Sequence, residues 1–213
     1  MESPQRSVTF SRLALALAGT VVLAAVLALA WVLRPPAPKL MEAGAVPAFH
    51  LTDQDGKSLG LEDLKGKVWV ASFIYTRCRT SCPVVTADMA RLARALRGQK
   101  DLRLVSVSVD PTHDTPAVLK AYAKDMGAVD PRWSFLTGKP RAVYDLVQGG
   151  FHLSAGGPQM LKNKGAVPLM HSTKLALVDR RGHIRGYFDT GYGTKGGVRD
   201  AERAARWLLR NTE

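Results

Sequence analysis

The chain has 213 residues, of which 46% are hydrophobic and 23% are charged. These values are typical of a globular protein and exclude an intrinsically disordered or collagen-like chain, while two cysteines are too few for a small fold held together by disulfides. The net charge of +12 would suit an anionic membrane, a nucleic acid or an acidic protein, and charge alone does not choose among these partners.

An uncharged apolar stretch, residues 13–33, lies near the N-terminus. As a helix it would be long enough to cross a bilayer. A cleaved secretory signal is the alternative, because Ala28-Leu29-Ala30 resembles a cleavage site, but the apolar cores of signals have only about 7 to 15 residues. We therefore expect an N-terminal tail at 1–12, a transmembrane helix at 13–33 that serves as an anchor, and an extended Pro-rich linker at 34–46.

From residue 47 to the C-terminus, strand-like and helix-like patterns alternate. Runs of β-branched and aromatic residues predict buried strands, and apolar residues at helical spacing, with Pro near the start and Gly after the end, predict helices. In chain order we expect a strand at 68–75, a helix that begins near Pro83 and stops at Gly98, a strand at 102–109, helices at 116–126 and 140–147, a hairpin of strands 175–178 and 184–188, and a helix at 197–209. The order βαβαβαββα, with parallel crossovers first and a hairpin last, predicts an α/β fold, a three-layer sandwich, for residues 47–213.

Both cysteines lie in the segment Thr76–Pro83, between the end of a predicted strand and the start of a predicted helix. This is the edge of an α/β sheet where ligands usually bind. The helix N-terminus, Arg77 and Arg79 should favour a thiolate at neutral pH, and thiolates bind soft metals and attack disulfides. Because Cys78 and Cys82 are four residues apart, they are close enough for a disulfide or for one shared metal ion. A purely structural pair is the alternative, and the flanking arginines argue against it.

The cysteine pair alone does not make a structural zinc site, which needs four ligands. Two thiolates and one imidazole suit Cu(I) and tolerate Cu(II), so a copper site requires a histidine. The candidates are His50, His113, His152, His171 and His183. His171 is the best placed, since the loop before the predicted hairpin lies beside the first strand–helix turn, and His113, after the second central strand, could also approach. Met160 and Met170 could add a thioether, but methionine is more often a packing residue.

Four motifs occur in a fixed order along the chain. They are the segment 49–56, the C-x-x-x-C-P motif of Cys78 and Cys82, Val-Ser-Val-Asp-Pro at 107–111, and His171-Ser172-Thr173. Together they resemble the Sco (SenC/PrrC) family, whose members have a thioredoxin-like fold. The resemblance covers residues 47–213 and, because it combines distant motifs, it is more specific than any one of them.

The resemblance implies a membrane-tethered copper chaperone that helps to assemble the binuclear copper centre of cytochrome c oxidase subunit II. It implies that Cys78, Cys82 and His171 hold one copper ion per chain, as Cu(I) or Cu(II). The implied partners are subunit II or a similar copper-centre protein and other copper carriers. The implied location is the inner (cytoplasmic) membrane, with a single membrane pass and the soluble domain on the periplasmic side or its mitochondrial equivalent.

The chain departs from the family pattern at two positions. Arg79 stands where a proline commonly follows the first cysteine, which should make the loop more flexible and stabilise the thiolate further. Met170 occupies a position often held by aspartate, so partner recognition is expected to differ. Asp110 matches the family's aspartate, for which a cap of the following turn and a role at the metal site both remain open.

Three functions remain open at this point. A copper metallochaperone needs both thiols and His171, whereas a membrane-tethered thiol-disulfide reductase, the enzymatic alternative, needs only the thiols. A redox or copper sensor without metal transfer is the third. A peroxidase is disfavoured, because residues 73–76 before Arg77-Cys78 lack the usual peroxidase motif, and nucleic-acid binding has only the charge in its favour.

Overall fold

The computed structural model describes residues 5–32, 37–153, 173–191, 194 and 197–211, which belong to two compact units, Met1–Ala37 and Pro38–Glu213. The described part of the first unit is mainly the helix α1 (Gln5–Val32), whose sequence is rich in the strong helix formers alanine and leucine. Within the described residues, no helix combines the length and the apolar character that a membrane crossing requires. The transmembrane anchor predicted at 13–33 is therefore not supported by the structure.

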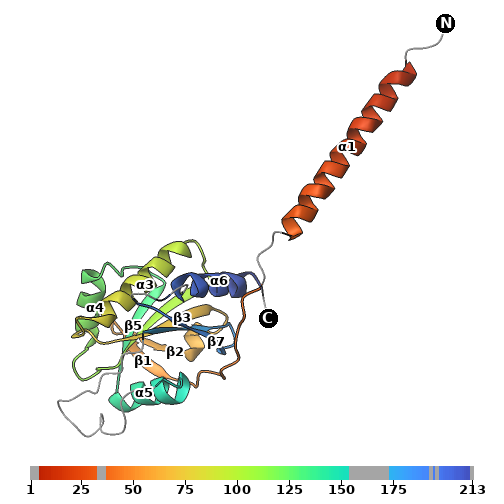
Figure 1. Ribbon diagram of the computed structural model, residues 1–213. Helices are drawn as coiled ribbons and strands as arrows, with labels where there is room; N and C mark the ends of the chain where they lie inside the picture. Colours follow the sequence, from red (N-terminus) through yellow and green to blue (C-terminus); the bar gives the residue numbers. More distant parts are fainter. Residues whose placement is uncertain (1–4, 33–36, 154–172, 192–193, 195–196, 212–213) are drawn as a thin grey trace. The chain divides into compact units, whose positions relative to one another are not determined.

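The second unit is built on a seven-stranded sheet (Figure 1). Its strands are β1 (His50–Asp53), β2 (Ser58–Gly60), β3 (Val68–Ile74), β4 (Leu102–Ser108), β5 (Trp133–Thr137), β6 (Lys174–Val178) and β7 (Ile184–Asp189). Across the sheet the order is β2-β1-β5-β4-β3-β6-β7. The three central strands β3, β4 and β5 are parallel, and every other pair of neighbours is antiparallel.

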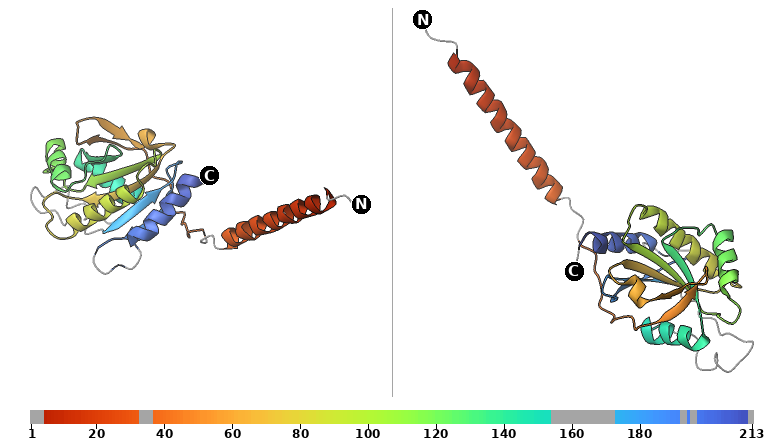
Figure 2. Two further views of the ribbon diagram at one scale, coloured as in Figure 1. Left: turned by 90° about the horizontal axis from the view of Figure 1, so that it is seen from above. Right: turned by 180° about the vertical axis from the view of Figure 1, so that it is seen from behind.

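Helices cover both faces of this sheet and so make three layers (Figures 1 and 2). They are α2 (Leu61–Leu64), α3 (Ser81–Ala95), α4 (Pro116–Asp125), α5 (Pro140–Tyr144) with the π-helical turn η1 (Asp145–Gly150), and α6 (Gly197–Arg210). α3 and α6 lie side by side on one face, and α5 lies on the other. α4 is joined to α3 by a 2.8 Å hydrogen bond between the hydroxyls of Thr86 and Tyr122. The predicted three-layer α/β sandwich is confirmed.

Several elements differ from the expected boundaries. α3 begins at Ser81 rather than near Pro83. The predicted order requires a third strand, and this strand is β5. A short β1–β2 hairpin precedes the predicted core. These three strands have five residues or fewer, too few for a clear alternation of apolar and polar residues. The helix expected at 140–147 ends at Tyr144 and continues as η1.

Part of the predicted linker is attached to the sheet. The Met41 N–H donates to the Arg185 carbonyl at 2.9 Å, and the Ala43 N–H donates to the Ile184 carbonyl at 3.1 Å. Residues 41–46 therefore run along β7 and occupy the backbone groups of an edge strand, which would otherwise be open to pairing with another chain.

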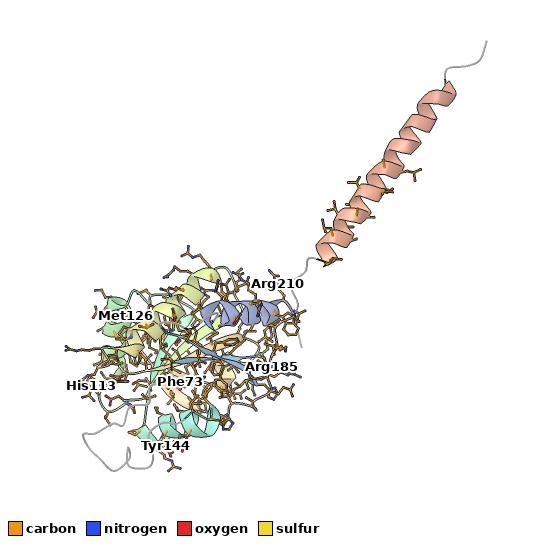
Figure 3. The ribbon with its side chains drawn as sticks, viewed as in Figure 1. Phe73, His113, Met126, Tyr144, Arg185 and Arg210 are labelled. Atoms are coloured by element: carbon orange, nitrogen blue, oxygen red, sulfur yellow. The ribbon has the colours of Figure 1, made fainter. Side chains whose placement is uncertain are left out.

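The core is centred on β3, all seven residues of which are buried, as expected for a strand covered on both faces. The ring of Phe151, just after η1, has its centroid 5.8 Å from that of Trp69 and 5.0 Å from that of Phe73. Figure 3 shows Phe73 well inside the domain. Because the cysteine loop follows β3 directly, this packed strand fixes where the loop begins.

Candidate metal centre

The two cysteines meet at the start of α3. Cys78 lies in the loop between β3 and α3, and Cys82 is the second residue of α3. Each residue is 5% exposed, and both thiols are free. The backbone N–H of Cys82 donates to Cys78 Sγ at 3.3 Å, and the two thiols also share a hydrogen bond. The four-residue spacing therefore brings both sulfurs to one place, as predicted.

The sulfur of Cys78 acts where a helix N-cap side chain would act. Thr80, at the N-cap position of α3, makes no capping hydrogen bond with its side chain. Instead Cys78 Sγ accepts the N–H of Cys82 and lies 3.7 Å from Thr80 Oγ1 and 3.6 Å from Ser81 Oγ. Because the first N–H groups of a helix lack intrahelical partners and attract negative charge, this position favours a thiolate.

The two thiols consequently ionise at very different pH. Burial opposes ionisation of Cys78, but hydrogen bonds from the backbone of Cys82 and Thr80 and from the Ser81 side chain lower its pKa from 9.0 to about 5. Burial, with a further contribution from the adjacent Cys78 sulfur, raises the pKa of Cys82 to about 12. At neutral pH the pair therefore carries one thiolate, on Cys78, and one thiol, on Cys82.

Of the two causes that the sequence predicted for the thiolate, the helix N-terminus is the main one and the arginines are not. The Arg77 guanidinium turns to Asp110 and donates to its Oδ2 at 3.1 Å and 2.6 Å, and Arg79 is exposed. Hydrogen bonds at the start of α3 are the main causes that lower the pKa of Cys78. Arg77 instead ties the cysteine loop to the loop that follows β4.

The sequence left two roles open for Asp110, a cap of the following turn and a role at the metal site, and its contacts support the cap. It is 1% exposed, and besides the Arg77 pair its carboxylate accepts a hydrogen bond from the Thr112 hydroxyl at 3.1 Å. Its carbonyl accepts the N–H groups of His113 and Asp114 at 3.0 Å and 2.9 Å. The side chain thus caps the turn after β4 and also holds the cysteine loop against it.

A second buried carboxylate, Asp114, was not identified from the sequence as a site residue. Its Oδ2 accepts the Thr76 N–H at 3.0 Å and the Ser108 hydroxyl at 2.5 Å, and its Oδ1 accepts the Thr76 hydroxyl at 2.5 Å. Asp114 is fully buried, so these hydrogen bonds satisfy a charge that water does not reach. The carboxylate fixes the cysteine loop two residues before Cys78.

Tyr75 is a further site residue that the sequence analysis missed. It is 8% exposed, and burial, together with its side-chain hydrogen bond to Cys78, raises its pKa to about 12. A phenol that keeps its proton can donate to the Cys78 thiolate. The available signal was its position directly after β3, at the edge of the sheet that carries the cysteines.

Among the described residues, no histidine joins the cysteines. Of the five histidines, four are described: exposed His50, His113 and His152, and half-buried His183. In the described part of the chain, no group of three or more His, Cys, Asp or Glu side chains is placed to hold a metal ion. His171, with Met160 and Met170, lies outside the described residues.

Thr173 is the first described residue after His171, and it lies at the cysteine end of the sheet. β6 runs antiparallel to β3, with Ala71 opposite Ala176, so the first residue of β6 lies beside the end of β3. The carbonyl of Thr173 accepts the N–H of Thr190 at 2.8 Å and fixes this point of the chain. His171 is therefore two residues from a segment anchored at the same edge as the cysteine loop.

Comparisons with known proteins point to one family. A family model described as SCO1/SenC matches residues 39–206. The chain is 36% identical over 140 residues to a SCO1 protein homolog from Bacillus subtilis, and the match covers 65% of this chain and 70% of the relative.

Two solved structures extend the comparison to the fold. ScoI from Bradyrhizobium japonicum, with copper bound, is 29% identical and has a TM-score of 0.62 over 78% of this chain and 99% of its own. BsSco, described as a member of the Sco family of cytochrome c oxidase assembly proteins with a disulfide switch, is 29% identical and has a TM-score of 0.67 over 84% of this chain and 99% of its own. The likeness confirms the predicted thioredoxin-like Sco fold.

Proposed function

Because the chain belongs to the SCO1/SenC family, we propose that it is a copper metallochaperone. It binds one copper ion through Cys78, Cys82 and His171 and delivers it to the binuclear copper centre of cytochrome c oxidase subunit II or a similar protein. The copper bound to the related ScoI and the assembly role given to BsSco support this proposal.

The observation that carries the proposal is the pair of adjacent, buried thiols of which one is already ionised. Thiolate sulfur is the ligand that Cu(I) prefers, and Cu(I) accepts a low coordination number. Cys78 has a pKa of about 5, so at neutral pH it offers a thiolate without losing a proton. Copper then displaces the proton of Cys82, because only the thiolate is a strong ligand.

His171 completes the proposed ligand set. It lies two residues before Thr173, whose backbone is hydrogen-bonded at the cysteine edge of the sheet, so a short segment suffices to reach the sulfurs. A ligand on a separate segment from the two cysteines can be withdrawn while the thiolates still hold copper. Transfer to a partner then proceeds by exchange of one ligand at a time.

A thiol-disulfide reductase is the second candidate, and the difference between the two thiol pKa values favours it. The Cys78 thiolate attacks one sulfur of a partner's disulfide, forms a mixed disulfide and releases the other sulfur as a thiolate that takes up a proton. Cys82 then loses its proton and attacks Cys78 Sγ, which forms the Cys78–Cys82 disulfide and releases the second thiolate. Two electrons pass from the pair to the partner.

Copper stoichiometry tests the site directly. The related ScoI chain corresponds over 99% of its length to part of this chain, so residues 38–213 can be produced as a folded domain. The reduced domain should hold one copper ion, and Cys78→Ser or Cys82→Ser should each abolish binding. Oxidation to the Cys78–Cys82 disulfide, identified by alkylation mass spectrometry, should also abolish it, because a disulfide offers no thiolate. Full copper retention by both single variants would refute the proposed site.

His171→Ala separates the two candidate functions, with His50→Ala as the matched control. Loss of one ligand should weaken Cu(I) binding about 10-fold or more, equivalent to about 1.4 kcal/mol, while reduction of a model disulfide changes little. His50 is exposed on β1, so its replacement should leave both properties intact. If His171→Ala leaves copper affinity and copper-centre assembly in cells intact while Cys78→Ser destroys assembly, the reductase replaces the chaperone.

A further inference from the structure

Basic side chains gather at the end of the domain where β3 and β4 begin. This basic end consists of Lys67, Arg97, Lys100, Arg103, Arg181 and Arg210. These residues come from four separate segments, which the parallel strands and the end of α6 bring to one edge of the sheet.

Side-chain contacts join these segments to one another. Lys67 Nζ lies 2.7 Å from Asp101 Oδ1, which links the start of β3 to the loop before β4. Arg180 NH2 lies 4.0 Å from Asp101, and Arg180 NH1 donates to the Leu208 carbonyl at 2.6 Å, which links the β6–β7 turn to the end of α6. These contacts hold the four segments together, so the cations that they carry lie at one end of the domain.

The charge at this end is poorly balanced by carboxylates. Among the described residues, the carboxylates at this end are Asp101, which is 51% exposed and approached by Lys67 and Arg180, and the buried Asp179, which lies 3.7 Å from Arg185. The nearby Glu62 and Glu202 pair with Lys65 and with Arg206. An excess of cations over carboxylates on one face attracts anionic surfaces and steers association with them.

The basic end lies opposite the cysteines. The parallel strands β3 and β4 start at the basic end, and the loops that follow them carry Cys78 and His113 at the other end. Figure 3 shows Arg210 and His113 on opposite sides of the domain. A partner that takes copper must reach the cysteine end, so it leaves the basic end free for a second contact; only this step rests on the proposed function.

The geometry points to the surface of an anionic phospholipid membrane as the occupant of the basic end. Four of the six cations are arginines, whose planar guanidinium groups suit phosphate oxygens. Trp207, three residues before Arg210 on α6 and half-buried, adds an amphipathic side chain of the kind that favours the membrane–water interface. The domain would then rest on the membrane with its cysteines turned away from the lipid.

Vesicle binding by residues 38–213 tests this inference without the N-terminal segment. The domain should bind vesicles rich in phosphatidylglycerol, not vesicles of phosphatidylcholine alone, and added salt should release it. The combined variant Arg97→Gln, Lys100→Gln, Arg210→Gln should weaken binding about 100-fold, taking about fivefold for each cation lost. The matched control Lys57→Gln, Lys124→Gln, Lys139→Gln removes the same charge from exposed lysines elsewhere and should weaken binding less than fivefold.

Equal losses in the two combined variants would overturn the inference, because total charge rather than the basic end would then govern binding. Failure to bind anionic vesicles would also overturn it, and binding to polyglutamate alone would assign the surface to an acidic protein instead. Copper binding, measured in the same variants, should stay at the wild-type level. A failure of the copper proposal would appear in that measurement alone and is distinguishable from a failure of the lipid inference.

Discussion

Replacement of Asp114 by alanine tests whether the buried carboxylate holds the cysteine loop in place. The change removes the acceptor of the Thr76 N–H, the Thr76 hydroxyl and the Ser108 hydroxyl. The hydroxyls can rotate toward other acceptors, but the N–H of Thr76 cannot, and an orphaned buried donor costs about 1–3 kcal/mol. With about 0.5–1 kcal/mol for each hydroxyl, the free energy of unfolding should fall by about 3 kcal/mol.

Urea unfolding and copper titration of residues 38–213 measure the two consequences. A loss of about 3 kcal/mol corresponds to a fall in Tm of roughly 6–12 °C for a domain of this size, and copper affinity should fall with it because the loop before Cys78 loses its anchor. Asp114→Asn should cost less, since the amide keeps one oxygen acceptor and can donate to the Thr76 hydroxyl.

Thr115→Ala is the matched control, one residue away. The Thr115 hydroxyl caps α4 by accepting the Val118 N–H at 3.4 Å, so its hydrogen bond serves α4 rather than the cysteine loop. Its loss should cost about 1 kcal/mol and leave copper affinity unchanged. If Asp114→Ala costs no more than this control and binds copper equally well, the carboxylate does not position the loop and the reasoning is refuted.

Three further predictions follow from the thiols and the core. The rate of alkylation of Cys78 should rise with pH, with a midpoint around 5. Ser81→Ala should raise this midpoint more than Arg77→Ala does, because the Ser81 hydroxyl is hydrogen-bonded to the Cys78 sulfur and Arg77 is not the main stabiliser of the thiolate. A larger rise in Arg77→Ala would contradict this reasoning. Copper binding at pH 7 should release one proton from the pair, measured in weak buffer, and a release of two would mean that Cys78 is not ionised. Phe151→Ala should lower the free energy of unfolding by about 3–5 kcal/mol, measured with urea. A loss no larger than that caused by a substitution at an exposed position would mean that the ring does not contribute to the core.

The sequence predicted the central fold because its long buried strands have strong patterns. The strands predicted at 68–75 and 102–109 correspond to β3 and β4, each of which ends one residue earlier than predicted. β2 and β5 were not located, because three and five residues give no period to read. Their places are decided by pairing with β1 and β4, which is a property of the folded chain.

The thiol pair and the effect of the helix start on it were predictable, and the role of Arg77 was not. Spacing alone put Cys78 and Cys82 together, and the helix N-terminus predicted a thiolate, but the sequence also offered Arg77 and Arg79 as sources of the lowered pKa. In the structure Arg77 pairs with Asp110, which comes from a different loop. A residue's partner across the sheet depends on side-chain directions that sequence proximity does not reveal, and the same reason hid Asp114.

Ionisation of Cys78 and the stability of the reduced pair are linked. Its pKa is lowered from 9.0 to about 5, so the folded domain stabilises the thiolate; this contribution is complete above pH 9 and is lost as the pH falls through about 5. Stabilising the thiolate stabilises the reduced form, which raises the reduction potential of a disulfide made from it. The raised pKa of Cys82 opposes this at neutral pH only weakly, since that thiol is protonated in either environment.

Formation of the disulfide also takes the charge from the sulfur that caps α3, so the helix start loses its acceptor on oxidation. The arrangement therefore favours the two free thiols, which is the form that the proposed copper site requires.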